Sequence, residues 1–294
     1  MTDIASQRPT GLRARLRRKS TRLGIIGWLS IAVIVFWILV ALLAPWIAPY
    51  REGAIVVKQA FGTFDKTGLY LGSDYMGRDV LSRIVYGARM TLGIAFAACV
   101  LSFLIGTTLG FAAALMGGKI DEILSRTNDA FLAFPSIMLA LIVISTLGSS
   151  LTVLIVTVGF IEATRNFRVA RAIGMEISAL DFVEVARARG EGMWWILWNE
   201  ILPGSIAALS TDFGLRFTYS ILLVSTLSFI GLGVQPPHSD WGGLVRENMA
   251  GVHFFSNSVL VPAFCIFSIT LAVNFLVDWN LARSNKSISS EIVK

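Results

Sequence analysis

The polar residues of this chain offer few combinations that could carry out covalent chemistry. The two histidines, His238 and His253, have no cysteine or carboxylate at metal-ligand spacing, and Cys99 and Cys265 lie in apolar stretches where a thiol behaves as a small hydrophobic side chain. The sequence has no nucleophile and base in a recognisable pattern, and it has no G-x-x-x-x-G-K-[ST] loop for nucleotide phosphates. We therefore expect no catalytic site, no metal and no cofactor.

One acid and one base stand out because they border an apolar stretch. Asp212 and Arg216 are four residues apart, one helical turn, at the N-terminal side of the apolar segment 217–237. Ionisable groups in such a place are costly, so they indicate either a water-lined path or a mutual ion pair. We expect both side chains to face a translocation pathway, and an i, i+4 pair that only neutralises the two charges is the alternative.

The stretch 165–203 is too polar to cross a membrane and too regular to be a loose linker. The segment DFVEVARAR at 181–189 predicts a short helix that ends at Gly190, and MWWILWNEILP predicts a second helix that ends at Pro203. One side of the first helix would carry Phe182, Val185, Ala186 and Arg189. We expect the two short helices to stand outside the membrane.

The first of these helices has the composition of a docking surface. Small residues at Ala186, Ala188 and Gly190 would let another backbone come close, and Glu184 offers a carboxylate to donors of a partner protein. An amphipathic connector that packs only on its own chain is the alternative, because apolar patches alone only suggest partners.

A second polar pattern lies in LGSDYMGRDVLSRIVYGAR at 71–89. Its apolar positions at helical spacing are Leu81, Ile84, Val85 and Ala88, and the opposite side carries Asp79, Ser82, Arg83 and Tyr86. The pattern predicts an amphipathic helix at the outer membrane surface, with Asp79 and Arg83 spaced for an ion pair. Gly72 and Gly77 would form the turns before it. An elbow without a chemical task is favoured over a substrate contact.

The elements that hold these residues must lie in a membrane. The chain has 294 residues, of which 55% are hydrophobic and 15% charged, and its mean hydropathy of +0.70 is too high for a soluble domain. A span needs about 20 apolar residues to cross a hydrocarbon core of about 30 Å. Charge-poor stretches of this length run over 23–50, 90–118, 130–161, 217–237 and 248–277. The predicted fold class is an all-α polytopic membrane protein.

The distribution of basic residues predicts the topology. The stretch 130–161 forms either one long helix or two helices folded at residues 148–150. Two helices place most of the 25 basic residues inside, including those of 1–22 and 165–203, so six spans with both termini cytoplasmic is the better model. The net charge of +6 then reflects contact with membrane lipid rather than with nucleic acid.

Two motifs carry a resemblance to a known family. The polar stretch contains Glu184-Val185-Ala186, then Gly190, then Ile201-Leu202-Pro203, which resembles the cytoplasmic EAA signature of bacterial ABC importer permeases, with valine in place of the middle alanine. The outer segment resembles the C-type subunits of the dipeptide, oligopeptide and nickel uptake group. Its matching positions are Gly72-Ser73-Asp74, Gly77-Arg78-Asp79, Ser82-Arg83 and Gly87-Ala88-Arg89. Further matches are Ala133-Phe134-Pro135, residues 228–237 and Trp241-Gly242.

The resemblance implies a fold, partners and a place in the cell. It implies a type I ABC importer permease of the bacterial inner membrane, whose helix around Glu184 couples to a cytoplasmic ATPase. The implied partners are a B-type permease, two ATP-binding subunits and an extracytoplasmic solute-binding protein. Many members carry a glutamate where Val224 stands, so the polarity of the pathway is expected to differ from theirs.

The resulting organisation has five parts and two competing interpretations. We expect a basic cytoplasmic tail (1–22), an anchor (23–49), a periplasmic segment with the interfacial helix (50–90), a core (91–281) that contains the coupling loop 165–203, and a second tail (282–294). A secondary transporter would need inverted repeats or ion-coordinating broken helices, and a membrane enzyme would need a reactive constellation. The sequence contains no recognisable example of either.

Overall fold

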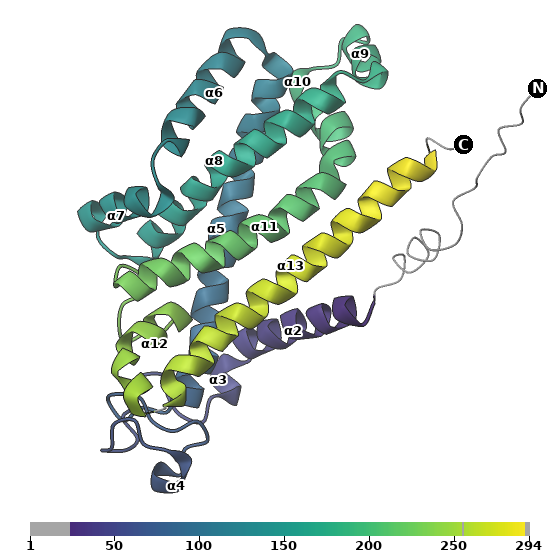
Figure 1. The fold of residues 1–294 in the computed structure, drawn as a ribbon. Helices are drawn as coiled ribbons and strands as arrows, with labels where there is room; N and C mark the ends of the chain where they lie inside the picture. Colours follow the sequence, from purple (N-terminus) through teal and green to yellow (C-terminus); the bar gives the residue numbers. More distant parts are fainter. Residues whose placement is uncertain (1–23, 255, 292–294) are drawn as a thin grey trace, which may run out of the picture.

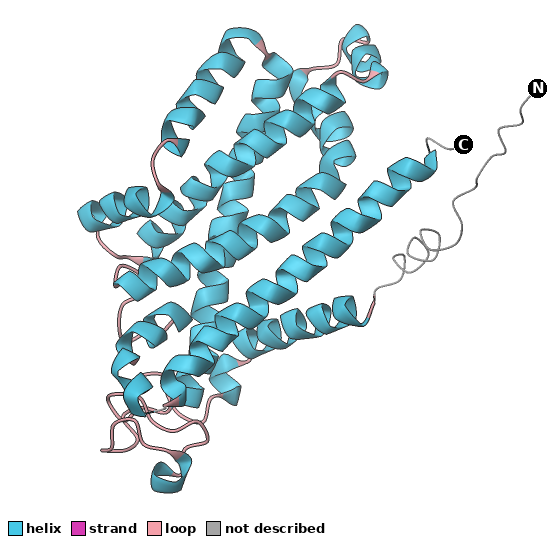
Figure 2. Ribbon diagram, viewed as in Figure 1, coloured by secondary structure: helices cyan, strands magenta, loops and turns pink. Residues whose placement is uncertain are grey.

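The computed structural model describes residues 24–254 and 256–291, and within these residues the chain is helical (Figures 1 and 2). The predicted basic tail 1–22 lies outside the described residues, as do residues 292–294. The helices are α2 (Ile25–Leu42), α3 (Ala44–Ile47), α4 (Phe64–Thr67), α5 (Val80–Met116), α6 (Gly118–Leu132), α7 (Ser136–Leu147), α8 (Leu151–Ser178), α9 (Asp181–Ala188), α10 (Met193–Ile196), α11 (Leu202–Ile230), α12 (Trp241–Glu247) and α13 (Asn257–Glu291). The described part of the chain contains isolated β-bridges but no strand, which confirms the all-α class.

Four of the described helical segments are long and apolar enough to cross a membrane. They are α2, α5, the continuous run Met193–Ile230 and α13, and the pair α6 and α7, bent by 85°, is a fifth candidate. Helix α8 has the length but not the composition, because it carries Glu162, Arg165, Arg168 and Arg171 along its middle turns.

The centre of the molecule is the packing of α5 against α8. Gly106 and Gly110 lie one turn apart on α5, and a Cβ atom at either would come within 2.7 Å of a backbone carbonyl of α8, that of Ala163 or that of Phe167. Small residues at this spacing let two membrane helices approach closely. Figure 1 shows α11 lying between α8 and α13, with α2 against α13.

The ambiguous stretch 130–161 contains a break, as the two-helix alternative predicted. Helix α7 ends at Leu147, Gly148 has a φ of +88°, and Ser150 caps the start of α8 by accepting a hydrogen bond from the Val153 amide. The boundaries differ from the prediction at the other end. Because α7 has 12 residues, it is only about 18 Å long, and it continues from α6 through a bend rather than forming a full span alone.

The separate interfacial helix predicted within 71–89 does not form. Helix α5 is continuous over 37 residues from Val80, so the elbow and the second span are one helix. Its polar side does not face water: Ser82 and Arg83 are buried. The physical reason is that α12 packs here, with the indole N–H of Trp241 donating to the Ile84 carbonyl at 3.1 Å.

Candidate functional site

Asp212 and Arg216 lie in the middle of a buried polar cluster. Both are buried on α11, and the Arg216 Nε donates a hydrogen bond to the Asp212 Oδ1 at 3.2 Å. The geometry is therefore that of the i, i+4 pair. Neither charge is left exposed on the surface of the chain.

The pair continues onto α8 through Glu162. Arg216 also donates to Glu162 Oε2 at 3.1 Å, and the other carboxylate oxygen of Glu162 accepts from Arg165 at 2.5 Å. The Glu162 side chain has no exposed surface. Arg165 in turn donates to the Ser136 hydroxyl, at the start of α7, at 2.6 Å. The cluster therefore links α11, α8 and α7.

On its other side the cluster reaches α5. Asp212 Oδ2 accepts from the Asn166 amide at 2.9 Å, and Asn166 Oδ1 accepts from the Thr107 hydroxyl at 3.0 Å. Two carboxylates and two guanidinium groups balance in charge, and each carboxylate has two side-chain donors. Full pairing is what makes the burial of such groups tolerable in a membrane protein.

Sequence reasoning found two members of this cluster and missed the others. Glu162 directly follows the apolar stretch that was taken to end at Ile161, and Arg165 was assigned to the cytoplasmic loop. A carboxylate and a guanidinium three residues apart at the end of an apolar stretch were the available signal. Arg216, the partner of Glu162 on α11, is 54 residues away, and Asp212, the partner of Asn166, is 46 residues away, so no local pattern joins them.

One side of the cluster opens into a cavity of about 330 Å³. The side chain of Arg165 is 36% exposed and Tyr219 is 46% exposed. The guanidinium carbons of Arg165 and Arg216 lie 5.9 and 5.3 Å from the centre of the Tyr219 ring, which fits a cation–π contact. The remaining lining residues are Pro135, Ser136, Ile137, Glu162, Leu222, Leu223 and Thr226.

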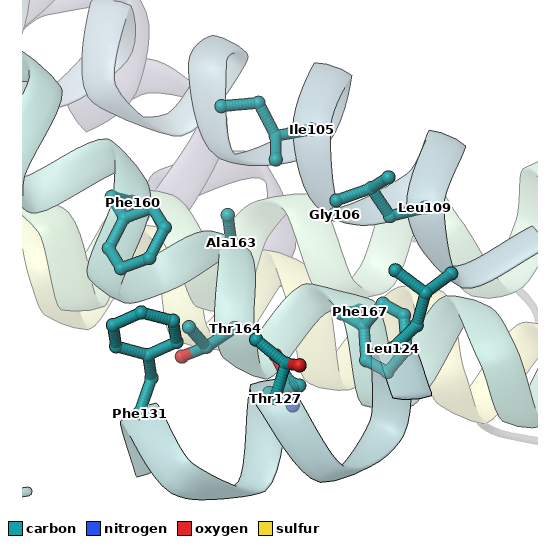
Figure 3. A pocket seen from close by; sticks show the side chains of 11 residues that line it. Ile105, Gly106, Leu109, Leu124, Thr127, Phe131, Phe160, Ala163, Thr164 and Phe167 are labelled. Atoms are coloured by element: carbon teal, nitrogen blue, oxygen red, sulfur yellow. The ribbon is translucent and has the colours of Figure 1, made fainter. Parts of the chain in front are cut away.

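A second, smaller pocket of about 110 Å³ lies between α5, α6 and α8 (Figure 3). Its walls are mostly apolar, and the rings of Phe131 and Phe160 meet edge to face with their centres 4.9 Å apart. It has no charged lining residue. The position of Val224 is similarly apolar, because this side chain is fully buried among Ile94, Ala98 and Leu154.

The predicted coupling helix forms as α9, at the end of the molecule opposite α3, α4 and α12 (Figure 1). Val183 and Ala186 are completely buried in a cluster that includes Ile196 and Ile201. Glu184 and Arg187 are exposed, and so are two large apolar side chains, Phe182 and Val185. The helix thus has one anchored face and one free face.

The expected arrangement of residues on α9 needs one correction. Ala186 was placed on the same side as Phe182 and Val185 and was thought to admit a partner's backbone. It instead faces inward, because Val183 and Ala186, three residues apart on one side of the helix, pack in the buried cluster with Ile196 and Ile201. The free face therefore lacks Ala186, whereas Ala188 remains exposed on the helix.

Gly190 ends the helix as predicted, with a φ of +83°. The second short helix does not end at Pro203. A π-helical segment, Leu197–Ile201, joins α10 to α11, so the chain is helical from Met193 to Ile230. Pro203 directly follows the π-helical segment, at the second residue of α11. Ile201 is fully buried and Leu202 is half-buried.

The outer motif is an internally paired framework. The Asp74 carboxylate accepts from Arg78 at 2.6 Å, from Arg83 at 2.9 Å and from the backbone amides of Met76 and Arg78 at 2.8 Å each. Glu247 of α12 accepts from both arginines, at 3.0 and 2.7 Å. The motif therefore fastens the outer segment to α5 and α12.

The remaining residues of the outer motif have separate positions. Asp79 does not pair with Arg83 but caps α5, accepting from the Ser82 amide at 2.9 Å. Gly77 has a φ of +79°, and a Cβ atom there would overlap the Val57 carbonyl. Arg89 is exposed and lines a largely apolar cavity of about 590 Å³. The described contacts of these residues are structural, and whether any of them touches the solute stays a prediction.

Comparison with known proteins places these features in a family. Residues 106–288 match the model of the binding-protein-dependent transport system inner membrane component family. The chain belongs to this family. It is a permease component of an ABC importer and not an enzyme.

Curated relatives cover most of the permease. It is 34% identical, over 95% of its length and 92% of that protein, to a putative peptide transport system permease of Brucella suis. It is 32% identical to the glutathione transport system permease GsiD of Pectobacterium atrosepticum, over 85% of its length and 81% of that protein. It is also 32% identical to the dipeptide transport system permease DppC of Alkalihalophilus pseudofirmus, over 88% and 84% of the two chains.

A solved structure has the same fold. The permease is similar to a chain of the inward-facing MetNI methionine ABC transporter, with a TM-score of 0.53 over 68% of its own length and 97% of that chain. At 19% identity the likeness concerns the fold alone. It agrees with the type I importer fold that the resemblance implied.

Proposed function

We propose that this permease forms half of a translocation pathway for peptides or similarly small polar solutes, in a bacterial cytoplasmic membrane. The other half is a B-type permease, two ATP-binding subunits supply the energy, and an extracytoplasmic binding protein delivers the solute. The names of the relatives, which include peptide, dipeptide and glutathione permeases, support the solute class.

The proposed topology has six spans with both termini in the cytoplasm. Helix α8 is added to the five candidate spans in this arrangement. Its charges have partners on α6, since Arg168 pairs with Asp129 at 3.1 Å and Arg171 pairs with Asp121 at 2.5 Å. Paired charges lower the cost of placing such a helix in the membrane. Residues 165–178 of the predicted coupling loop are instead part of α8, and the remainder, 179–203, then faces the cytoplasm, as the positive-inside rule favours.

The observation that carries the coupling proposal is that α9 packs on one continuous helical run, Met193–Ile230, which we call the rod. Val183 and Ala186 of α9 pack on Ile196, Leu197 and Ile201, and those residues belong to the helical run that continues as α11. The free face, with Phe182, Glu184 and Val185, is the surface that we assign to the ATP-binding subunit. A shift of α9 is passed to α11 through this helical run, whose π-helical segment Leu197–Ile201 forms part of the contact with α9.

The same rod carries the residues that we assign to the translocation pathway. Asp212 and Arg216 lie on α11 behind the cavity lined by Arg165 and Tyr219. In this proposal the buried pair does not touch the solute directly. It fixes Glu162, and Glu162 orients Arg165 at the cavity wall.

The test is ATP-dependent uptake by the purified permease reconstituted with its co-encoded subunits and binding protein in liposomes. We expect uptake of a dialanine peptide only when both ATP and the ATP-binding subunits are present. A Val185→Asp substitution, on the free face of α9, should abolish uptake and leave membrane insertion intact. Uptake by the permease alone, driven by an ion gradient, would instead support a secondary transporter.

A further inference from the structure

The cavity beside the charged cluster has the features of a binding subsite. Its volume of about 330 Å³ falls at the lower end of the range of roughly 300–1,000 Å³ that is usual for small-molecule sites. Three helices meet here, since Ser136 comes from α7, Arg165 from α8 and Tyr219 from α11. The lining of this cavity combines a partly exposed charge with several polar groups and apolar walls.

The charge presented to this cavity is positive. Glu162 lines it but has no exposed side-chain surface, whereas Arg165 is 36% exposed. Asp212 and Arg216 neutralise each other behind Glu162. A solute that enters therefore meets the guanidinium of Arg165 before any carboxylate.

Arg165 can bind a further anion without releasing its present partners. A guanidinium has five N–H donors in a fixed fork, and the hydrogen bonds to Glu162 and Ser136 use two of them. Arginine forks match the geometry of a carboxylate. The start of α7 adds to this, because Ser136 lies in its first turn, no side chain caps it, and a helix N-terminus favours negative charge.

We propose that this cavity binds the carboxylate group of the transported solute during its passage, with Arg165 as the charged contact. The hydroxyl group of Tyr219 is a further donor, and Leu222, Leu223 and Ile137 provide apolar wall for the adjoining side chain of the solute. The inference rests on the proposed function, since it assigns the recognition of peptide-like acids to this site in the permease.

The experiment compares a dialanine peptide with its C-terminal amide in the reconstituted transporter. The affinity of the binding protein for each peptide is measured separately, and both are supplied at saturating concentration. We expect the wild-type permease to take up the free acid about tenfold more efficiently, which corresponds to one charge-assisted hydrogen bond. Arg165→Gln should lower uptake of the acid, per assembled transporter, about tenfold more than uptake of the amide and so remove the preference.

Two further variants separate recognition from folding. Arg168→Gln is the matched control, because Arg168 lies one turn away on α8, is 64% exposed and is not part of the cavity. It should keep the preference for the acid. Arg165→Lys keeps a positive charge beside Glu162 but loses the fork, so it should assemble normally and show a reduced preference.

The outcomes distinguish the inference from the proposed function. If the wild-type transporter takes up neither peptide in the presence of ATP, the proposed function is wrong. If it takes up both and Arg165→Gln leaves the ratio of acid to amide unchanged, or lowers both equally, the subsite is wrong and the proposed function stands. A loss of the preference in Arg165→Gln and its retention in Arg168→Gln support the subsite.

Discussion

Arg216 on α11 donates a hydrogen bond of 3.1 Å to Glu162 on α8, and this contact joins the two halves of a four-charge cluster. The residues are 54 positions apart in the sequence, yet Glu162 has no exposed side-chain surface and both of its oxygens are paired. The cluster fixes the position of α11, on whose N-terminal extension α9 packs, relative to Arg165 in the cavity wall. Its integrity is therefore a condition for both stability and transport.

Glu162→Gln should destabilise the permease strongly. The substitution leaves Arg165 and Arg216 without their shared carboxylate, and removing one partner of a buried ion pair costs about 3–5 kcal/mol. Glu122→Gln is the control, because the Glu122–Arg126 pair is exposed and such pairs contribute about 0–1 kcal/mol. Thermal unfolding in detergent measures the difference. Equal melting temperatures for the two variants would contradict a stabilising role of the cluster.

Gly106→Ala should loosen the packing of α5 on α8. The new methyl group would lie within 2.7 Å of the Ala163 carbonyl, and overpacking of this kind costs about 1–3 kcal/mol. Gly93→Ala on the same helix is the matched control, because a Cβ there meets nothing within 4 Å. The helical propensity of alanine is about 0.8–1.0 kcal/mol more favourable than that of glycine. The two variants should therefore shift the unfolding temperature in opposite directions. A shift of Gly106→Ala to higher temperature would show that the helices are not in close contact.

The loop before α12 should make stability depend on pH. Burial raises the pKa of Asp240 from 3.8 to about 6, and the charge of Glu247 adds to the rise. The folded protein therefore keeps this proton where the unfolded chain has lost it, so stability falls as the pH rises from about 4 to about 6. Two pKa units correspond to about 3 kcal/mol.

The check on this pH dependence is Asp240→Asn. Asparagine caps a helix as well as aspartate does, and it can still accept from the amides of Gly242 and Gly243. The variant should be more stable than the wild type at pH 7, and its unfolding temperature should lack the Asp240 step between pH 4 and 6. An unchanged slope would place the titrating group elsewhere.

The sequence was sufficient for features that depend on neighbouring residues. Each apolar stretch contains a helix, although the helices begin and end at other residues, and the glycine after DFVEVARAR predicted the end of α9 at Gly190. Spacing alone also placed Asp212 and Arg216 one turn apart on one helix, where they do pair. These features follow from helical periodicity and from backbone conformation, which are local.

What could not be predicted depends on contacts between distant segments. The outer motif was expected to form an amphipathic helix at the membrane surface, but Arg83 on its polar side is buried because Glu247 and α12, more than 150 residues later, cover it. Ala186 was expected on the docking face and is instead anchored on Ile201 and its neighbours. In both cases the pattern correctly predicted a helix. It could not predict which side of the helix is buried, because that side is determined by a segment distant in the sequence.

Gly190→Val should uncouple ATP hydrolysis from transport. A β-branched residue is strongly disfavoured at a φ of +83°, so the substitution should displace the end of α9 relative to the rod that begins at Met193. No atom lies within 4 Å of the position of the new Cβ, so the effect would come from the backbone and not from a clash. Gly192→Val is the matched control, since its φ of −73° suits valine and its surroundings are equally open. Uptake per ATP hydrolysed in liposomes should fall at least about fivefold for Gly190→Val only, the lower end of typical coupling energies. Normal uptake by this variant would show that the geometry at the end of α9 does not transmit the movement of the ATP-binding subunit.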